Sequence, residues 1–250
     1  MRNLRAFWKR PSRLTLTAGS IFALVAVPAV AIPLNPAWVV EGLARLSPDV
    51  TYFVETERAA VALTIDDGPD PVATPLILEV LERHGARATF FVISDRVPGN
   101  EALLRRILDE GHEIANHLTR EEPSILLPAQ RFEEELRMAH ETLSEYQESR
   151  WFRPGSGLYD DEMLTTVGRY GYSTALGSVY PYDAQIPSAW FAERYILANA
   201  GPGAIIVLHD VGARGRRTAA ALDAILPELM ARGLEVTTLS DLAGGSDPSG

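Results

Sequence analysis

Apolar residues follow two alternating patterns along most of the chain: short continuous runs, and longer stretches with apolar residues on one helical face. The continuous runs predict buried strands at residues 61–65, 87–93, 113–115, 151–153, 173–176, 204–209 and 234–237. The one-faced stretches predict helices at 74–84, 101–110, 128–146, 160–170, 189–198 and 218–232, and Gly85 ends the first of them. This alternation indicates a parallel sheet covered on its faces, as a closed barrel or as an open sheet.

The N-terminal segment has a different pattern. Five basic residues occur within positions 2–13, and residues 14–34 then carry no charge. Such a run is long enough to span a membrane, and its basic flank would stay in the cytoplasm. The small residues at 29–31 also fit a signal-peptide cleavage site. We therefore expect a signal peptide or a membrane anchor at 1–34, and a globular part that is exported to the periplasm or the extracellular space.

The rest of the chain is divided into three further parts. Apolar residues at roughly helical spacing within 36–48 predict a short helix, inside a linker at 35–58, that packs on the domain or lies at the membrane surface. A single catalytic domain is expected at 59–243, because one α/β barrel fits this length. Residues 244–250 are expected to form a flexible tail.

Composition excludes several classes of function. The net charge of −10 argues against a nucleic-acid partner, which usually requires a basic patch. The chain has no cysteine, so disulfides, cysteine-bound zinc, a thiol nucleophile and a lipid anchor on cysteine are all excluded.

Candidate chemistry lies at or just after the ends of the predicted strands. Asp66 and Asp67 follow an apolar strand and precede the forced turn Gly68-Pro69. Two adjacent carboxylates repel, unless one binds a cation while the other accepts protons. Other strand ends carry further candidates, namely His117, Arg153, Asp183 and His209. Parallel sheets build their sites at this edge. On the strand that leads to His117, His112 faces the opposite side, so the two histidines are not expected to share an ion.

Five segments in this order resemble the polysaccharide deacetylases, carbohydrate esterase family 4. They are the Asp66-Asp67-Gly68-Pro69 run, the segment 111–117, the Arg153-Pro154-Gly155-Ser156-Gly157 loop, Asp183, and the strand that ends in His209-Asp210. The resemblance covers residues 60–242 and implies an irregular (β/α) barrel of about seven parallel strands.

The resemblance also implies a reaction, the hydrolysis of an N-acetyl amide with a divalent metal. By this resemblance Asp66 is the base, Asp67 and His117 bind the metal, and His209 is the acid. Arg153 is then expected to orient Asp66, and Asp183 to orient His209. Where the family has a Pro-Pro-Tyr-Gly loop after the arginine, this chain has Gly155 and Ser156, so the oxyanion contact from this loop is left to a backbone N–H.

The metal-binding segment departs from the family pattern at the second histidine, which is Glu121 here. If residues 117–121 make one helical turn, Glu121 lies on the same face as His117 and completes the ligand set. The alternative is a solvent-facing Glu121 with a weakened or lost metal site, and Glu122 is a weaker candidate ligand. Zinc is the expected metal, with manganese, cobalt or magnesium as alternatives for an oxygen-rich site.

The predicted function is therefore removal of N-acetyl groups from a chitin- or peptidoglycan-type polysaccharide that contains N-acetylglucosamine. One alternative is a non-catalytic glycan-binding relative with a decayed metal site, and another is a deformylase of an N-formylated sugar. An N-acetylated glycan is the expected partner, and no protein partner is implied. Aromatic residues with the potential to stack on sugar rings, or to pack in the core, are Tyr159, Tyr180, Tyr182 and Trp190.

Overall fold

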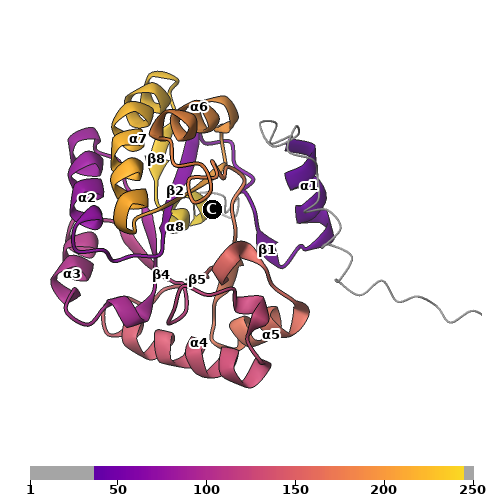
Figure 1. The fold of residues 1–250 in the computed structure, drawn as a ribbon. Coiled ribbons are helices and arrows are strands. Elements are labelled where there is room, and N and C mark those ends of the chain that lie inside the picture. Colours follow the sequence, from indigo (N-terminus) through magenta and orange to yellow (C-terminus); the bar gives the residue numbers. More distant parts are fainter. Residues whose placement is uncertain (1–36, 245–250) are drawn as a thin grey trace, which may run out of the picture. The chain divides into compact units, whose positions relative to one another are not determined.

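The computed structural model describes residues 37–244, which form alternating strands and helices (Figure 1). The strands are β1 (Val50–Thr51), β2 (Ala60–Asp66), β3 (Thr89–Val92), β4 (Glu113–Asn116), β5 (Trp151–Phe152), β6 (Ser173–Ala175), β7 (Ile205–His209) and β8 (Glu235–Thr237). The helices are α1 (Ala37–Leu46), α2 (Ala73–His84), α3 (Glu101–Asp109), α4 (Ala129–Ser144), α5 (Asp161–Arg169), α6 (Ala189–Asn199), α7 (Gly212–Ala231) and α8 (Leu239–Gly244). Short 3₁₀ turns are formed by Ser94–Arg96, Ser124–Leu126 and Gly155–Gly157.

The strands form one curled parallel sheet. Its order is β1-β6-β5-β4-β3-β2-β7, and β8 pairs with the start of β2. Isolated bridges connect the two ends of this path: Phe53, after β1, pairs with Ala204, before β7, and Val179, after β6, pairs with Ile206 of β7. The predicted fold, a single-domain irregular (β/α) barrel of about seven parallel strands, is confirmed.

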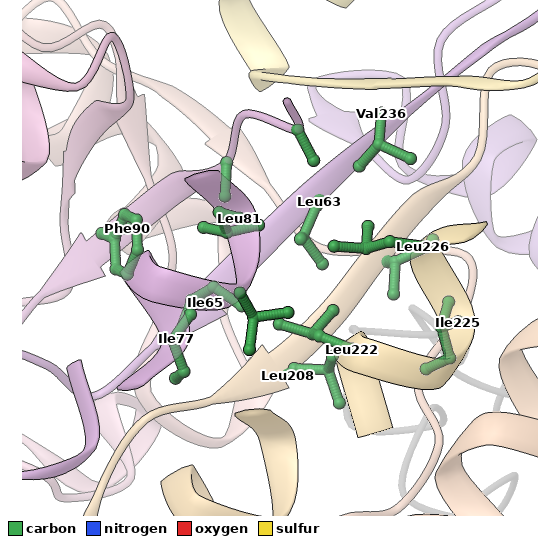
Figure 2. Close-up of a cluster of buried hydrophobic side chains, with 14 of the residues drawn as sticks. Leu63, Ile65, Ile77, Leu81, Phe90, Leu208, Leu222, Ile225, Leu226 and Val236 are labelled. Carbon is green, nitrogen blue, oxygen red and sulfur yellow. The ribbon is translucent and has the colours of Figure 1, made fainter. Parts of the chain in front are cut away.

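Strand β2 shows how the two faces of the sheet are used. All seven of its residues are buried, as expected of a parallel strand covered on both sides. Leu63 and Ile65 pack outward against the helical layer of α2 and α7, with Leu81, Leu222 and Leu226 (Figure 2). The alternate residues Ala60 and Ala62 belong to a second cluster, with Phe91, Ala115 and Trp151. Because side chains alternate, Thr64 and Asp66 share the face of Ala60 and Ala62.

The observed helices and strands differ from the predicted ones mainly at short or glycine-containing segments. Strand β1 and helix α8 were not predicted, because two and six residues are too short to show a period. Strand β1 lies within the segment expected to be a linker and is part of the sheet. Helix α7 begins at Gly212, six residues before the predicted start at 218, because Gly212 and Gly215 are weak helix formers that hide its first turn.

The N-terminal part of the described chain is the predicted short helix, α1. Its described side chains from 39 to 46 are half-buried or exposed. Among residues 37–244, no helix combines the length and the apolar character that a membrane crossing requires. The predicted signal or anchor at 1–34 and residues 245–250 of the predicted tail lie outside the described residues.

Candidate active site

The carboxyl ends of the strands and the loops after them surround one cavity of about 470 Å³. Of the predicted site residues, Asp66, Asp67, His117, Glu121, Arg153 and His209 line this cavity. Asp183 lies behind His209 and contacts it. The structure therefore gathers residues from positions 66 to 209 of the chain at one edge of the sheet, which is the edge where parallel sheets carry their sites.

Register places Asp66 beside His209. The two residues are directly paired at the ends of β2 and β7 in a parallel ladder. Paired residues in adjacent strands project to the same face, so the carboxylate and the imidazole face the same cavity. Both side chains are buried, which keeps them largely out of bulk water.

A buried guanidinium, that of Arg153, holds Asp66. Its Nη1 donates to Asp66 Oδ1 at 2.5 Å and to Thr64 Oγ1 at 2.8 Å. Its other nitrogens donate to the carbonyl oxygens of Ala175, the last residue of β6, and of Leu176, the residue after it. A planar fork with this many fixed acceptors cannot rotate freely, so Arg153 holds the Asp66 carboxylate in one orientation.

His209 is held by Asp183. Its Nδ1 lies 2.9 and 3.0 Å from the two carboxylate oxygens of Asp183, which leaves Nε2 as the ring nitrogen without that contact. Burial alone would lower the pKa of His209, but the hydrogen bond and charge of Asp183, with the charges of Asp66 and Asp67, outweigh burial and raise the pKa. The ring edge of Tyr180 packs against the imidazole at 5.9 Å between centroids.

Asp67 and His117 form a second pair in the cavity. His117 Nε2 lies 3.4 Å from Asp67 Oδ1, and His117 Nδ1 donates to the carbonyl oxygen of Arg153 at 2.7 Å. Burial would raise the pKa of Asp67, but the hydrogen bond and charge of His117, with the charges of His209 and Arg214, lower it to about 2. An imidazole fixed at one nitrogen and facing a carboxylate with the other is a common arrangement of metal ligands.

Glu121 is engaged by arginines. Its Oε2 accepts from Arg96 Nη2 at 2.6 Å, and its Oε1 lies 3.6 Å from Arg214 Nη2. Across residues 37–244, no three His, Cys, Asp or Glu side chains are gathered so that they could hold a metal ion. Asp67 and His117 nevertheless supply a carboxylate and an imidazole 3.4 Å apart, which are donor types that divalent metals take. Glu121 as the third ligand stays a prediction, and Glu122 pairs instead with Arg131 at 2.6 Å.

Backbone strain is concentrated at this site. Within the described residues, the non-glycine residues with positive φ are Asp67 (74°), Leu118 (62°), Ser156 (64°) and Tyr182 (56°). Asp67 and Ser156 line the cavity, Leu118 follows His117, and Tyr182 precedes Asp183. Such conformations cost on the order of 1–3 kcal/mol each and persist where surrounding contacts impose them. The strain therefore marks the same loops that the motifs indicate.

Two arginines that contact the site residues were not identified by the sequence analysis. Arg214 Nη1 donates to Asp67 Oδ2 at 2.9 Å, and Arg96 Nη1 donates to the Asp67 carbonyl oxygen. Arg214 lies in the first turn of α7, which the glycines at 212 and 215 concealed. A Cβ at Gly215 would lie 2.4 Å from the backbone of Asp210, so the close approach of this turn requires glycine. The sequence offered no motif that joins either arginine to the site.

The remaining aromatic and histidine candidates differ in whether they line the cavity. Of the four aromatic residues considered for sugar stacking, Tyr180 lines the cavity. Tyr182 packs on Tyr180 and Tyr195, Tyr159 bonds to Tyr52, and Trp190 is 68% exposed on α6. His112 faces away from His117, as expected: it is buried, accepts from the Ala88 N–H, and burial lowers its pKa to about 4.

Comparison with known sequences identifies relatives over most of the chain. The sequence model of the polysaccharide deacetylase family matches residues 53–175. A peptidoglycan-N-acetylglucosamine deacetylase of Bacillus cereus is 36% identical over 196 residues, which are 77% of this chain and 92% of the relative. A chitooligosaccharide deacetylase of a Bradyrhizobium species is 35% identical over 73% of this chain and 90% of the relative.

Solved structures show the same fold. A peptidoglycan N-acetylglucosamine deacetylase superposes with a TM-score of 0.76 at 27% identity, covering 81% of this chain and 97% of its own. A family 4 pseudoenzyme from Bacillus anthracis gives a TM-score of 0.73 at 26% identity over 81% and 72% of the two chains, and a mutant of it is described as having restored activity. A family 4 acetyl xylan esterase from Clostridium thermocellum, in complex with cobalt, gives 0.68 at 31% identity over 73% and 89%.

The curated relatives are more than 30% identical to this chain over about three quarters of its length. The predicted enzyme class, a hydrolase that acts on carbon–nitrogen bonds other than peptide bonds, is confirmed at the level of the family. The chain belongs to the polysaccharide deacetylase family.

Proposed function

We propose that this protein is a metal-dependent deacetylase that removes N-acetyl groups from a glycan containing N-acetylglucosamine. The observation that carries the proposal is the pairing of Asp66 with His209 at the mouth of the cavity, each held by its own buried partner. A carboxylate and an imidazole on one face of the sheet supply a base and an acid for amide hydrolysis. The named relatives act on peptidoglycan and on chitooligosaccharides, which supports this class of substrate.

The contacts of the residues support the roles proposed for them. Asp66 accepts a proton from the attacking water as the water oxygen bonds to the acetyl carbon. The bond between that carbon and the amide nitrogen then breaks, and His209 donates a proton from Nε2 to the leaving amine. Acetate and a free amino sugar result. Arg153 and Asp183 are positioning residues, because each holds a reacting side chain by hydrogen bonds. Since Nδ1 of His209 faces Asp183, the raised pKa favours the protonated acid.

A divalent metal would be held by Asp67 and His117, with Glu121 as the proposed third ligand. When bound, such a metal polarises the carbonyl and lowers the pKa of water. Zinc is the proposed metal, and manganese, cobalt and magnesium are alternatives for an oxygen-rich donor set. Support comes from the donor chemistry of Asp67 and His117, and from a relative that was solved with cobalt.

One observation favours a second candidate, a glycan-binding relative without catalysis. Glu121 is paired with two arginines, and a family 4 pseudoenzyme has the same fold. Metal content after dialysis, together with acetate release from an N-acetylglucosamine oligomer, separates the two candidates. Acetate release supports the deacetylase, whereas glycan binding without acetate release supports the second candidate. A parallel assay of formate release from an N-formylated sugar tests the deformylase alternative.

We also propose that the domain is exported, because a basic leader precedes the uncharged run at 14–34. A reporter that is active only outside the cytoplasm, fused after Gly250, should give signal. Deletion of residues 14–34 is the matched control and should abolish the signal. A silent fusion with the run intact would contradict export.

The first catalytic prediction concerns the base. Asp66→Asn should lower turnover by about 10²–10⁴-fold, the usual contribution of a general base, while zinc binding stays close to that of the wild type. Acetate release and zinc content are measured side by side. Asp109→Asn, an exposed carboxylate at the end of α3, is the control. Near wild-type turnover of Asp66→Asn would refute the assignment.

A second prediction concerns pH. Asp183→Asn should lower the pKa of His209, because it removes the charge that raises it. The protonated acid is then lost at a lower pH, so the alkaline limb of the pH–rate profile should move to lower pH. The His209 contribution to folding stability, present below its unfolded pKa of about 6.5 and lost as the pH rises through the raised folded pKa, should also shrink. NMR titration of the His209 ring checks the shift, and an unchanged alkaline limb would count against the role of Asp183.

A third prediction concerns Glu121. Its position four residues after His117 is where the family has its second histidine. Glu121→Ala should weaken zinc binding by about 10–100-fold and reduce acetate release with it. Glu121→His should restore or raise zinc affinity, because it rebuilds the family pattern. Glu122→Ala is the matched control, since Glu122 pairs with Arg131. If Glu121→Ala binds zinc as tightly as the wild type, Glu121 is not a ligand.

A further inference from the structure

The Asp67 and Glu121 carboxylates both face the guanidinium group of Arg214. Arg214 donates from Nη1 to Asp67 Oδ2 at 2.9 Å, and its Nη2 lies 3.6 Å from Glu121 Oε1. Arg96 contacts the same two residues, Glu121 through its carboxylate and Asp67 through its carbonyl oxygen. The two acidic groups proposed as metal ligands are therefore bridged by guanidinium groups.

This bridge and a divalent metal compete for the carboxylate oxygens that face Arg214, namely Asp67 Oδ2 and Glu121 Oε1. Each oxygen that faces a guanidinium is turned toward that donor, and arginine has no lone pair with which to ligate a metal itself. A divalent ion beside the Arg214 guanidinium would also meet a like charge in a partly buried site, where Coulomb repulsion is less screened than in water. A metal held by Asp67 Oδ2 and Glu121 Oε1, the two oxygens that face Arg214, therefore requires Arg214 to leave.

Asp67 and His117 are more deeply buried than Glu121 and Arg214. The side chains of Asp67 and His117 are 6% and 7% exposed, and His117 is fixed by the Arg153 carbonyl oxygen. The side chains of Glu121 and Arg214 are 43% and 24% exposed. Arg214 lies in the first turn of α7, where Asp70 accepts a hydrogen bond from the Gly212 N–H and so holds the backbone. Because the Arg214 side chain is partly exposed, it can move toward solvent while the backbone stays in place.

We propose that Arg214 is a tethered cation that occupies Asp67 and Glu121 in the metal-free protein and competes with the divalent metal for them. The competition lowers metal affinity, and displacement of Arg214 frees Glu121 Oε1 to become the third ligand, while Arg96 keeps its hydrogen bond to Glu121 Oε2. This inference rests on the metal site of the proposed function. It adds a residue that the family pattern does not point to, and it explains why a carboxylate at position 121 faces arginines.

The test is metal affinity, measured without turnover. The full chain is stripped with a chelator and titrated with Zn²⁺ against a chromophoric competitor, and with Co²⁺ by its absorption spectrum. Arg214→Met should bind about tenfold tighter than the wild type, because the competing charge is removed. Arg216→Met, on the exposed side of the same turn, is the control and should bind like the wild type.

Further variants test whether the tighter zinc binding of Arg214→Met depends on Glu121, and whether each protein is folded. In Arg214→Met/Glu121→Gln the gain should disappear, because the freed ligand is missing. Arg214→Lys keeps the charge but lacks the fork that spans both carboxylates, so its affinity should lie between those of the wild type and Arg214→Met. Thermal unfolding of each variant confirms that it is folded.

The outcomes separate this inference from the proposed function. Wild-type or weaker zinc binding by folded Arg214→Met and Arg214→Lys would overturn the competition. A gain that persists in full without Glu121 would overturn its part as the freed ligand. Absence of acetate release from every metal-loaded variant would instead count against the deacetylase, and the affinity result would still stand on its own.

Discussion

The buried ion pair between Arg153 and Asp66 is the interaction on which the site depends. One guanidinium reaches from the end of β5 to side chains on β2 and to backbone carbonyls after β6, and its centre lies 3.9 Å from the ring centroid of Phe91. Loss of either partner would leave an uncompensated buried charge, at a cost of about 3–5 kcal/mol. The carbonyl oxygen of the same arginine fixes His117. One residue thus sets the orientation of both the proposed base and a proposed metal ligand.

The parallel register is the second constraint. Asp66 and His209 are partners across β2 and β7, and the four residue pairs that precede them in the ladder tie the two strand ends together. A shift of one residue would turn one of the two side chains to the opposite face, where the helices pack. The apolar layer between the sheet and helices α2 and α7 prevents that shift, because it buries Leu63, Ile65 and Leu208 on the outer face. Packing on the outer face of the sheet therefore keeps Asp66 and His209 on its inner face.

The third constraint is charge. Asp66, Asp67 and Glu121 face one small cavity, and each is matched by an arginine: Asp66 by Arg153, Asp67 by Arg214, and Glu121 by Arg96 and Arg214. The Arg153 pair is fully buried, whereas Arg96 and Arg214 are partly exposed. A buried pair is costly to separate, and a partly exposed pair is much less so. The site thus combines a buried ion pair at the proposed base with more exposed ion pairs at the proposed metal ligands.

The sequence by itself determined the fold class and most of the site. Continuous apolar runs that alternate with one-faced helices are local signals, and they located β2, α2, β7 and their neighbours to within a few residues. The site residues Asp66, Asp67, His117, Arg153 and His209, and Asp183 from its weaker segment, were found from the family motifs that they match, at or just after the ends of predicted strands. The tertiary structure alone decided what Glu121 contacts. Its partners, Arg96 and Arg214, lie 25 and 93 residues away along the chain.

The tertiary structure also decided where α7 begins. Gly212 and Gly215 disfavour a helix locally, and they are held in it by the hydrogen bond to Asp70 and by close packing on Asp210. Local pattern carries no information about contacts of that kind, since they exist only once the strands have brought the loops together.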